Sequence, residues 1–168
     1  MSLRDIVARI PFISEAKRLE LHPPFWLMRI SVTKLSKDWR SIQIKLPQTA
    51  ISMNNYGGVF GGFQASLADP IAVVACSHIF PGYAIWTREL SLDFQQQPNT
   101  DLTLHFELSP QLEQQIRDDL ANKGRSTPTF EMYYQRSDGE ICTVIKNTIA
   151  IRPQGYKKQQ PKKPPQTS

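Results

Sequence analysis

Alternating apolar and polar residues predict six β-strands along the chain. In an extended segment such alternation places the apolar side chains on one face, which a core can then bury. The first two segments join at Ser36-Lys37-Asp38 and the last two at Ser137-Asp138-Gly139, so each pair is expected to form an antiparallel hairpin. The six predicted strands are 28–35, 40–46, 89–94, 102–108, 130–135 and 141–151.

Two longer segments have the apolar spacing of helices. Residues 63–80 are apolar on nearly every side and end at Pro81-Gly82, which predicts a buried helix. Residues 109–124 predict a second helix, capped by Ser109, ended by Gly124 and apolar along one stripe. The apolar stripe of this second helix consists of Leu112, Ile116 and Leu120. Shorter helical patterns are expected at 3–10 and 14–21, before His22-Pro23-Pro24.

These elements predict an α+β fold in which a curved antiparallel sheet of about six strands wraps around a long central helix. A helix that is apolar nearly all round must be covered on most sides, and a curved sheet can do this. A chain of 168 residues is long enough for one domain with a substantial core. We expect an N-terminal helical segment at 1–27, the main domain at 28–152, and a disordered basic tail rich in Pro, Lys and Gln at 153–168.

Charge and composition narrow the classes of function. The net charge is +5, but the four lysines of residues 153–168 account for most of it, so we expect no nucleic-acid partner. No apolar run approaches the roughly 18 residues that span a membrane, and MSLRDIVARIPF does not resemble a signal peptide, so a cytoplasmic protein with no membrane partner is expected. Three scattered histidines and the distant Cys76 and Cys142 form no metal-ligand spacing, and no cofactor is expected.

The stretch NNYGGVFGGFQASLADP, residues 54–70, holds four of the chain's eight glycines. It fits neither of the phosphate-loop patterns GxGxxG and GxxxxGK. Two interpretations stay open. The glycines could serve only the backbone, with a turn at Gly57-Gly58 and a close approach at Gly61-Gly62. Alternatively, the N–H groups of Gly61 and Gly62 at a helix start could stabilise a carbonyl oxygen that gains negative charge, as an oxyanion hole does.

Asp69 is the only charged residue between Phe63 and Phe80. At about 1.5 Å rise per residue it lies ~12 Å along the helix from Gly61, so it cannot reach the start of its own helix. It could reach the helix start of a second copy if two such helices pack in opposite directions, so this chemistry requires a dimer. A purely structural role for Asp69 is the alternative, and the adjacent Pro70 is expected to kink the helix.

The pattern Asn54, Phe60-Gly61-Gly62, Asp69 resembles the motif of the hotdog-fold acyl-CoA thioesterases of the PaaI-like branch. That motif has an Asn, then His-Gly-Gly, then Asp or Glu at the same spacing. The order of strands, together with FGGFQASLADP, YAIWTRELSLDF and LSPQLEQQIRDDLANKG, is similar to a hotdog family known only as a domain of unknown function. The resemblance covers residues 18–153 and implies that 28–152 form a single hotdog domain.

The resemblance also implies roles for individual residues. Gly61 would polarise the thioester carbonyl, Asp69 would activate water or attack the carbonyl, and Asn54 would place substrate or water. The substrate is further expected to contact Gly62, Phe60, Ser66 and Tyr56. Phe60 departs from the motif because it stands where the thioesterases have His, which removes a ring donor beside the site.

The resulting expectation is a homodimer, or a dimer of dimers, that hydrolyses thioesters of coenzyme A or of an acyl-carrier protein at a site between subunits. The alternative is a non-catalytic module that binds acyl-CoA or lipid in the same pocket. Phe60 and Pro70 favour this alternative, because either change could leave a site that binds without turnover.

Overall fold

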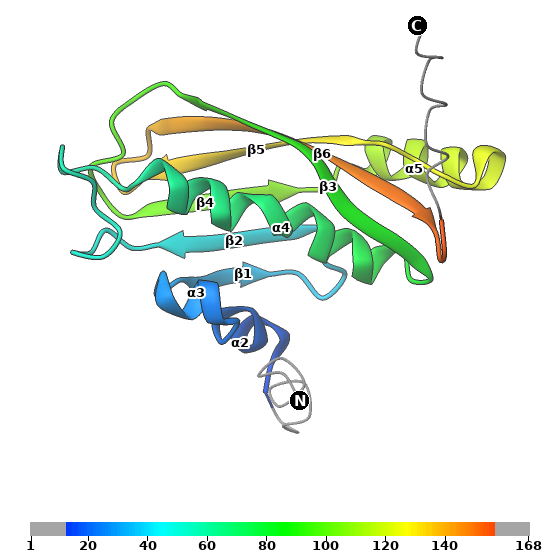
Figure 1. Ribbon diagram of the computed structural model, residues 1–168, viewed down its shortest axis with the longest axis horizontal. Helices are drawn as coiled ribbons and strands as arrows, with labels where there is room; N and C mark the ends of the chain where they lie inside the picture. The colour runs from blue at the N-terminus through cyan, green and yellow to red at the C-terminus, as the bar shows by residue number, and fades with distance from the viewer. Residues whose placement is uncertain (1–12, 157–168) are drawn as a thin grey trace, which may run out of the picture.

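A computed structural model describes residues 13–156, in which six antiparallel strands form one curved sheet. Figure 1 shows the long helix α4 lying across one face of this sheet. The strand order is β1-β2-β4-β5-β6-β3, so the predicted α+β architecture is confirmed. The strands are β1 Ser31–Leu35, β2 Ser41–Leu46, β3 Tyr83–Phe94, β4 Leu102–Glu107, β5 Thr129–Arg136 and β6 Ile141–Pro153. The helices are α2 Glu15–Glu20, α3 Pro23–Leu27, α4 Gly61–Ile79 and α5 Pro110–Lys123.

Both predicted hairpins are present, β1 with β2 and β5 with β6. Between β2 and β4 the chain runs through α4 and then β3, which pairs with β6 at the far edge of the sheet. Within the described residues β3 has a strand on one side only. A twelve-residue edge strand therefore leaves a row of backbone groups available on its outer side.

Strand β3 begins at Tyr83, six residues earlier than predicted. The first half of the strand was not predicted because a β-bulge between Thr87 and Glu89 interrupts the alternation of apolar and polar residues. Before the bulge Ile85 and Thr87 are partly buried, and after it the partly buried position shifts to Leu90. Arg88 and Glu89 are both exposed. A bulge adds one residue to one strand and redirects its side chains, so the two halves of β3 have opposite alternation phases.

Helix α4 buries one face against the sheet and leaves another open. Leu67, Ile71 and Ala75 are fully buried, and the sheet strands contribute the facing core residues Leu104, Phe106, Phe130, Met132 and Ile145. The opposite stripe is partly or fully exposed, and we call it the open stripe: Gly62, Ser66, Asp69, Val73 and Ser77. The sheet thus covers the buried face of α4, and the open stripe is left partly or fully exposed in the single chain. The helix continues through Pro70 without a break.

The described part of the N-terminal region forms two short helices, α2 and α3. Ser14 caps α2 by accepting a hydrogen bond from the N–H of Lys17, as the predicted helix at 14–21 requires. His22-Pro23-Pro24 ends α2 but also starts α3, because proline suits the first turn of a helix. The helix predicted at 3–10 and residues 157–168 of the predicted tail lie outside the described residues, while Pro153 is the last residue of β6.

Helix α5 follows its prediction, with Ser109 as cap and Gly124 in the left-handed conformation at φ +64°. Glu113 on α5 connects it to the β1–β2 hairpin. Its carboxylate accepts two hydrogen bonds from Arg40, at 2.6 and 2.8 Å, and two from Arg117, at 3.0 and 2.6 Å. The Arg40 hydrogen bonds, opposed by burial and assisted by Arg117, hold the pKa of Glu113 below its ordinary value.

We expect Glu113→Gln to change how stability depends on pH. A carboxylate with a lowered folded-state pKa contributes stability above its unfolded pKa, ordinarily 4.5, and loses that contribution as the pH falls through the folded value. The variant should be less stable near neutral pH, and the difference from wild type should shrink below pH 4.5. Urea unfolding at several pH values measures this. A difference that stays constant with pH would contradict the assigned role of Glu113.

Candidate functional site

The loop before α4 is shaped by Asn54. Its side-chain oxygen accepts hydrogen bonds from the N–H groups of Tyr56 (2.9 Å) and Gly58 (3.1 Å), and its own N–H donates to the carbonyl of Gly58 (2.8 Å). Gly57 has a φ of +77°, which is the positive-φ turn that the glycine pair predicted. In this structure the Asn54 side-chain oxygen therefore stabilises the loop. A contact between Asn54 and substrate stays a prediction.

Two N–H groups at the start of α4 remain available. The carbonyl of Phe60 accepts from the N–H of Phe63 (3.0 Å) and of Gln64 (3.3 Å). In the part of the chain that the structure describes, no acceptor engages the N–H of Gly61 or of Gly62. Such first-turn N–H groups carry the positive end of the helix dipole, so they suit a negatively charged or strongly polarised oxygen.

Aromatic rings lie close to these two glycines and limit the room for a side chain there. A Cβ on Gly62 would overlap the ring of Phe60, and a Cβ on Gly61 would lie 3.0 Å from Cζ of Phe94 at the end of β3. Both rings are about half exposed. The close approach expected of Gly61-Gly62 is thus present together with the available N–H groups, so the two interpretations of the cluster do not exclude each other.

A buried polar network fixes the first turn of α4. In the sequence, only a Gln within an apolar run pointed to such a network. Gln64 is fully buried. Its Nε2 donates to the carbonyl of Val59 (3.1 Å), and its Oε1 accepts from the hydroxyl of Thr143 (2.8 Å). The Tyr134 hydroxyl donates to the carbonyl of Gln64 (2.8 Å), and burial raises the pKa of Tyr134 well above its ordinary value. These contacts hold the helix start against β5 and β6.

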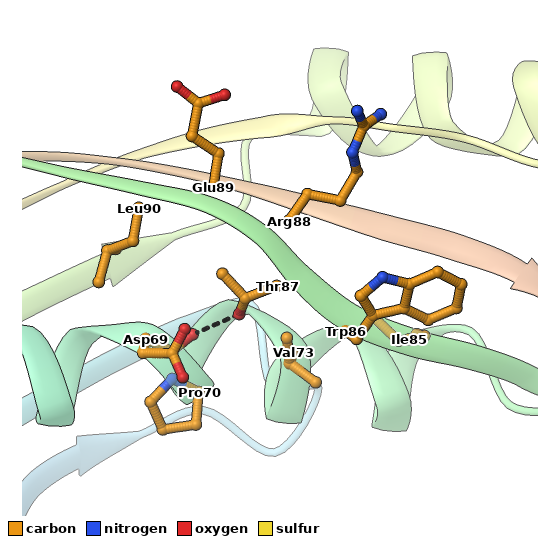
Figure 2. A pocket seen from close by; sticks show the side chains of 9 residues that line it. All are labelled: Asp69, Pro70, Val73, Ile85, Trp86, Thr87, Arg88, Glu89 and Leu90. Atoms are coloured by element: carbon orange, nitrogen blue, oxygen red, sulfur yellow. Dashed lines mark hydrogen bonds between the residues drawn. The ribbon is translucent and has the colours of Figure 1, made fainter. Parts of the chain in front are cut away.

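Asp69 borders an open cleft of about 390 Å³ between α4 and β3. Figure 2 shows the Thr87 side chain pointing toward Asp69, while Arg88 and Glu89 point away from α4. The bulge in β3 accounts for these two adjacent side chains sharing one side. The cleft is lined by Asp69, Pro70, Val73, Ile85, Trp86, Thr87, Arg88, Glu89 and Leu90.

The predicted site residues fall into three places. Asp69 lines the cleft, Gly61, Gly62 and Phe60 form the helix start, and Asn54 and Tyr56 lie in the preceding loop. Ser66 lies between the first two places on the open stripe and donates its hydroxyl to the carbonyl of Gly62 (2.8 Å). None of the helix-start or loop residues lines the cleft. One chain therefore does not bring its own carboxylate to its own free N–H groups, as the helix spacing predicted.

Within residues 13–156, no group of three or more His, Cys, Asp or Glu residues is arranged to hold a metal ion. No helix in the same range is long and apolar enough to cross a membrane.

A family model described as a domain of unknown function, DUF4442, matches residues 14–151. The chain belongs to the DUF4442 family. This match covers the whole sheet except the last residues of β6, together with all the described helices. A comparison of this DUF4442 chain with curated protein sequences gives no match.

Solved structures share the fold of this DUF4442 protein at low sequence identity. A probable thioesterase of unknown function, PA5026 from Pseudomonas aeruginosa, has a TM-score of 0.67 at 15% identity, covering 76% of this chain and 85% of its own. Thioesterase HI1161 from Haemophilus influenzae has a TM-score of 0.62 at 13% identity, covering 83% of this chain and 89% of its own. The PaaI protein of the Escherichia coli phenylacetic acid degradation operon has a TM-score of 0.57 at 15% identity, covering 79% of this chain and 86% of its own. These likenesses confirm the predicted hotdog fold.

Proposed function

We propose that this protein hydrolyses acyl thioesters of coenzyme A or of an acyl-carrier protein, at sites that two copies of the chain form together. The observation that carries the proposal is the pair of groups on α4. At its start, the N–H groups of Gly61 and Gly62 have no acceptor among residues 13–156. One exposed carboxylate, Asp69, lies about two turns further along. Proteins with the same fold and the printed description of thioesterase support the reaction class.

Two features support a site between copies. The open stripe of α4 consists mostly of small residues, so a second α4 could approach closely in the opposite direction. Within the part of the chain that the structure describes, no strand pairs with the outer edge of β3, so a second β3 could pair with its backbone groups. In such a dimer each helix start would lie beside the Asp69 of the other copy, so the two-fold axis would generate two equivalent sites.

The proposed reaction uses each group for one task. The N–H of Gly61 donates to the thioester carbonyl oxygen and stabilises the negative charge that develops on it. Asp69 of the second copy takes a proton from water as the water oxygen attacks the carbonyl carbon. The tetrahedral intermediate then collapses, the carbon–sulfur bond breaks, and the leaving thiolate takes up the proton. Attack by the Asp69 carboxylate itself, followed by hydrolysis of the anhydride, would give the same products.

The substrate chain would enter along the aromatic rings at the helix start. Phe60 and Phe94 flank the glycines and are each 52% exposed, so they offer apolar contact beside the reacting carbonyl. Gly62, Ser66 and Tyr56 are proposed to contact the rest of the substrate, and Asn54 to act by holding the loop that presents them.

A panel of acyl-CoA thioesters with different acyl chains tests the proposal, with the released thiol measured by a chromogenic reagent. We expect several substrates to be cleaved with saturation kinetics. Absence of turnover on the whole panel, and on the matching acyl-carrier-protein thioesters, would contradict it.

The second candidate is a module that binds acyl-CoA without turnover. Phe60 favours it, because a phenyl ring at this position adds apolar contact but offers no hydrogen-bond donor. This candidate predicts no thiol release, together with a melting temperature that rises with acyl-CoA concentration, since selective binding to the folded state stabilises it.

A further inference from the structure

The backbone carbonyl of Asp69 is held by two side chains of the sheet. The Thr87 hydroxyl on β3 donates to it at 3.0 Å, which Figure 2 marks with a dashed line. The side-chain amide of Asn147 on β6 donates to the same oxygen at 2.8 Å and to the carbonyl of Ala68 at 3.3 Å. Side chains from two neighbouring strands thus converge on one peptide group of α4.

This peptide group lies where α4 lacks one of its own backbone hydrogen bonds. Pro70 has no N–H, so the carbonyl of Ser66 lacks the donor that would normally close the helical turn around Asp69. The orientation of the Asp69–Pro70 peptide then depends more on contacts from outside the helix. Because the Asp69 side chain leaves the helix from this peptide, its direction depends on the same contacts.

Asn147 lowers the stability of the fold if its only role is to hold α4 against the sheet. It is fully buried, and within the described residues its Oδ1 has no hydrogen-bond partner. A buried acceptor left without a partner is destabilising, whereas an apolar residue of similar shape would avoid that cost. Thr87 stands at the edge of the β-bulge, where β3 changes the side to which its residues point. Both donors therefore occupy positions that packing alone does not explain.

We propose that Asn147 and Thr87 are positioning residues for Asp69. By holding its carbonyl they fix the direction in which the carboxylate leaves α4 into the cleft, and neither touches the substrate in this role. The inference rests on the proposed function for its effect on turnover. The geometry of the Asp69 peptide itself does not depend on that function.

A double-variant cycle on kcat tests this. Thr87→Val removes one hydrogen bond without changing side-chain volume, and is expected to lower kcat about tenfold with little change in KM. In the Asp69→Asn background the same substitution should have almost no further effect, because Thr87 acts through Asp69. Thr87→Ser should restore most of the turnover. An equal loss in both backgrounds would overturn the inference.

Thr148→Val is the matched control. Its hydroxyl exchanges a 2.8 Å hydrogen bond with that of Thr129 on the outside of the sheet and touches no residue of α4 through that bond. This variant should keep the kcat of the wild type. A loss equal to that of Thr87→Val would also overturn the inference.

Hydrogen–deuterium exchange separates this inference from the proposed function. If the wild type cleaves no thioester, the proposed function fails and exchange alone decides the inference. The amides of Asp69 and of residues 71–74 should then exchange faster in Thr87→Val and in Asn147→Leu than in Thr148→Val. Equal exchange in all three variants would show that the sheet contacts do not hold this turn.

Discussion

Replacing Asp69 with Asn is expected to lower kcat for thioester hydrolysis by about 100- to 10,000-fold, the range that a positioned general base contributes. The amide keeps the shape of the side chain but cannot take a proton from water. KM should change little, because Asp69 acts on water and not on the body of the substrate. Thiol release under saturating acyl-CoA measures the loss.

Asp118→Asn on α5 is the control for this prediction. Asp118 is exposed, accepts a hydrogen bond from Gln114 on the same helix, and is absent from the cleft lining. The Asp118→Asn substitution should leave both kcat and the melting temperature unchanged. Because Asp69 is also exposed, Asp69→Asn should fold as well as the wild type. Full activity in Asp69→Asn would show that this carboxylate is not the catalyst.

Gly61→Pro should lower kcat by about 100- to 1,000-fold, the effect of removing one donor from an oxyanion hole. Proline removes the N–H of residue 61 and suits this position, since Gly61 is the first residue of α4 and helices accept proline there. The preceding Phe60 already has φ −58° and ψ 128°, the conformation that a following proline requires. The helix should therefore form normally while the proposed donor is lost.

Gly61→Ala separates the donor from the side chain. It keeps the N–H and adds a Cβ that would lie 3.0 Å from Cζ of Phe94, an exposed ring that can shift by a few tenths of an ångström. Its kcat should stay within about tenfold of the wild type, well above that of Gly61→Pro. If the two variants lose activity equally, crowding at the helix start explains the loss and the N–H does not.

The fold was largely readable from hydrophobic periodicity because β2, β4 and β5 alternate buried with less buried residues. Residues 83–88 escaped prediction because the bulge after Thr87 reverses the alternation, so no single phase of apolar residues runs through β3. α3 escaped for a different reason, since Pro23-Pro24 indicates equally well the end of one helix and the first turn of the next.

The candidate site was only partly readable. Asp69 and the glycines were found because a lone charge and a glycine cluster depart visibly from their surroundings. Gln64, Thr87 and Asn147 were missed, since their roles come from pairing between elements that are distant in the sequence. The exposure of Asp69 in the single chain was also missed, because apolar residues around the whole helix do not reveal which face the sheet leaves open.

The most direct test of a site shared by two copies is to mix two inactive variants. Asp69→Asn and Gly61→Pro chains carrying different affinity tags are co-expressed, and the mixed dimer is isolated by two successive purifications. If Gly61 of one copy works with Asp69 of the other, the mixed dimer contains one intact site and should recover about half of the wild-type kcat per dimer. A mixed dimer as inactive as its parents, or a wild type that is active as a monomer, would contradict the account.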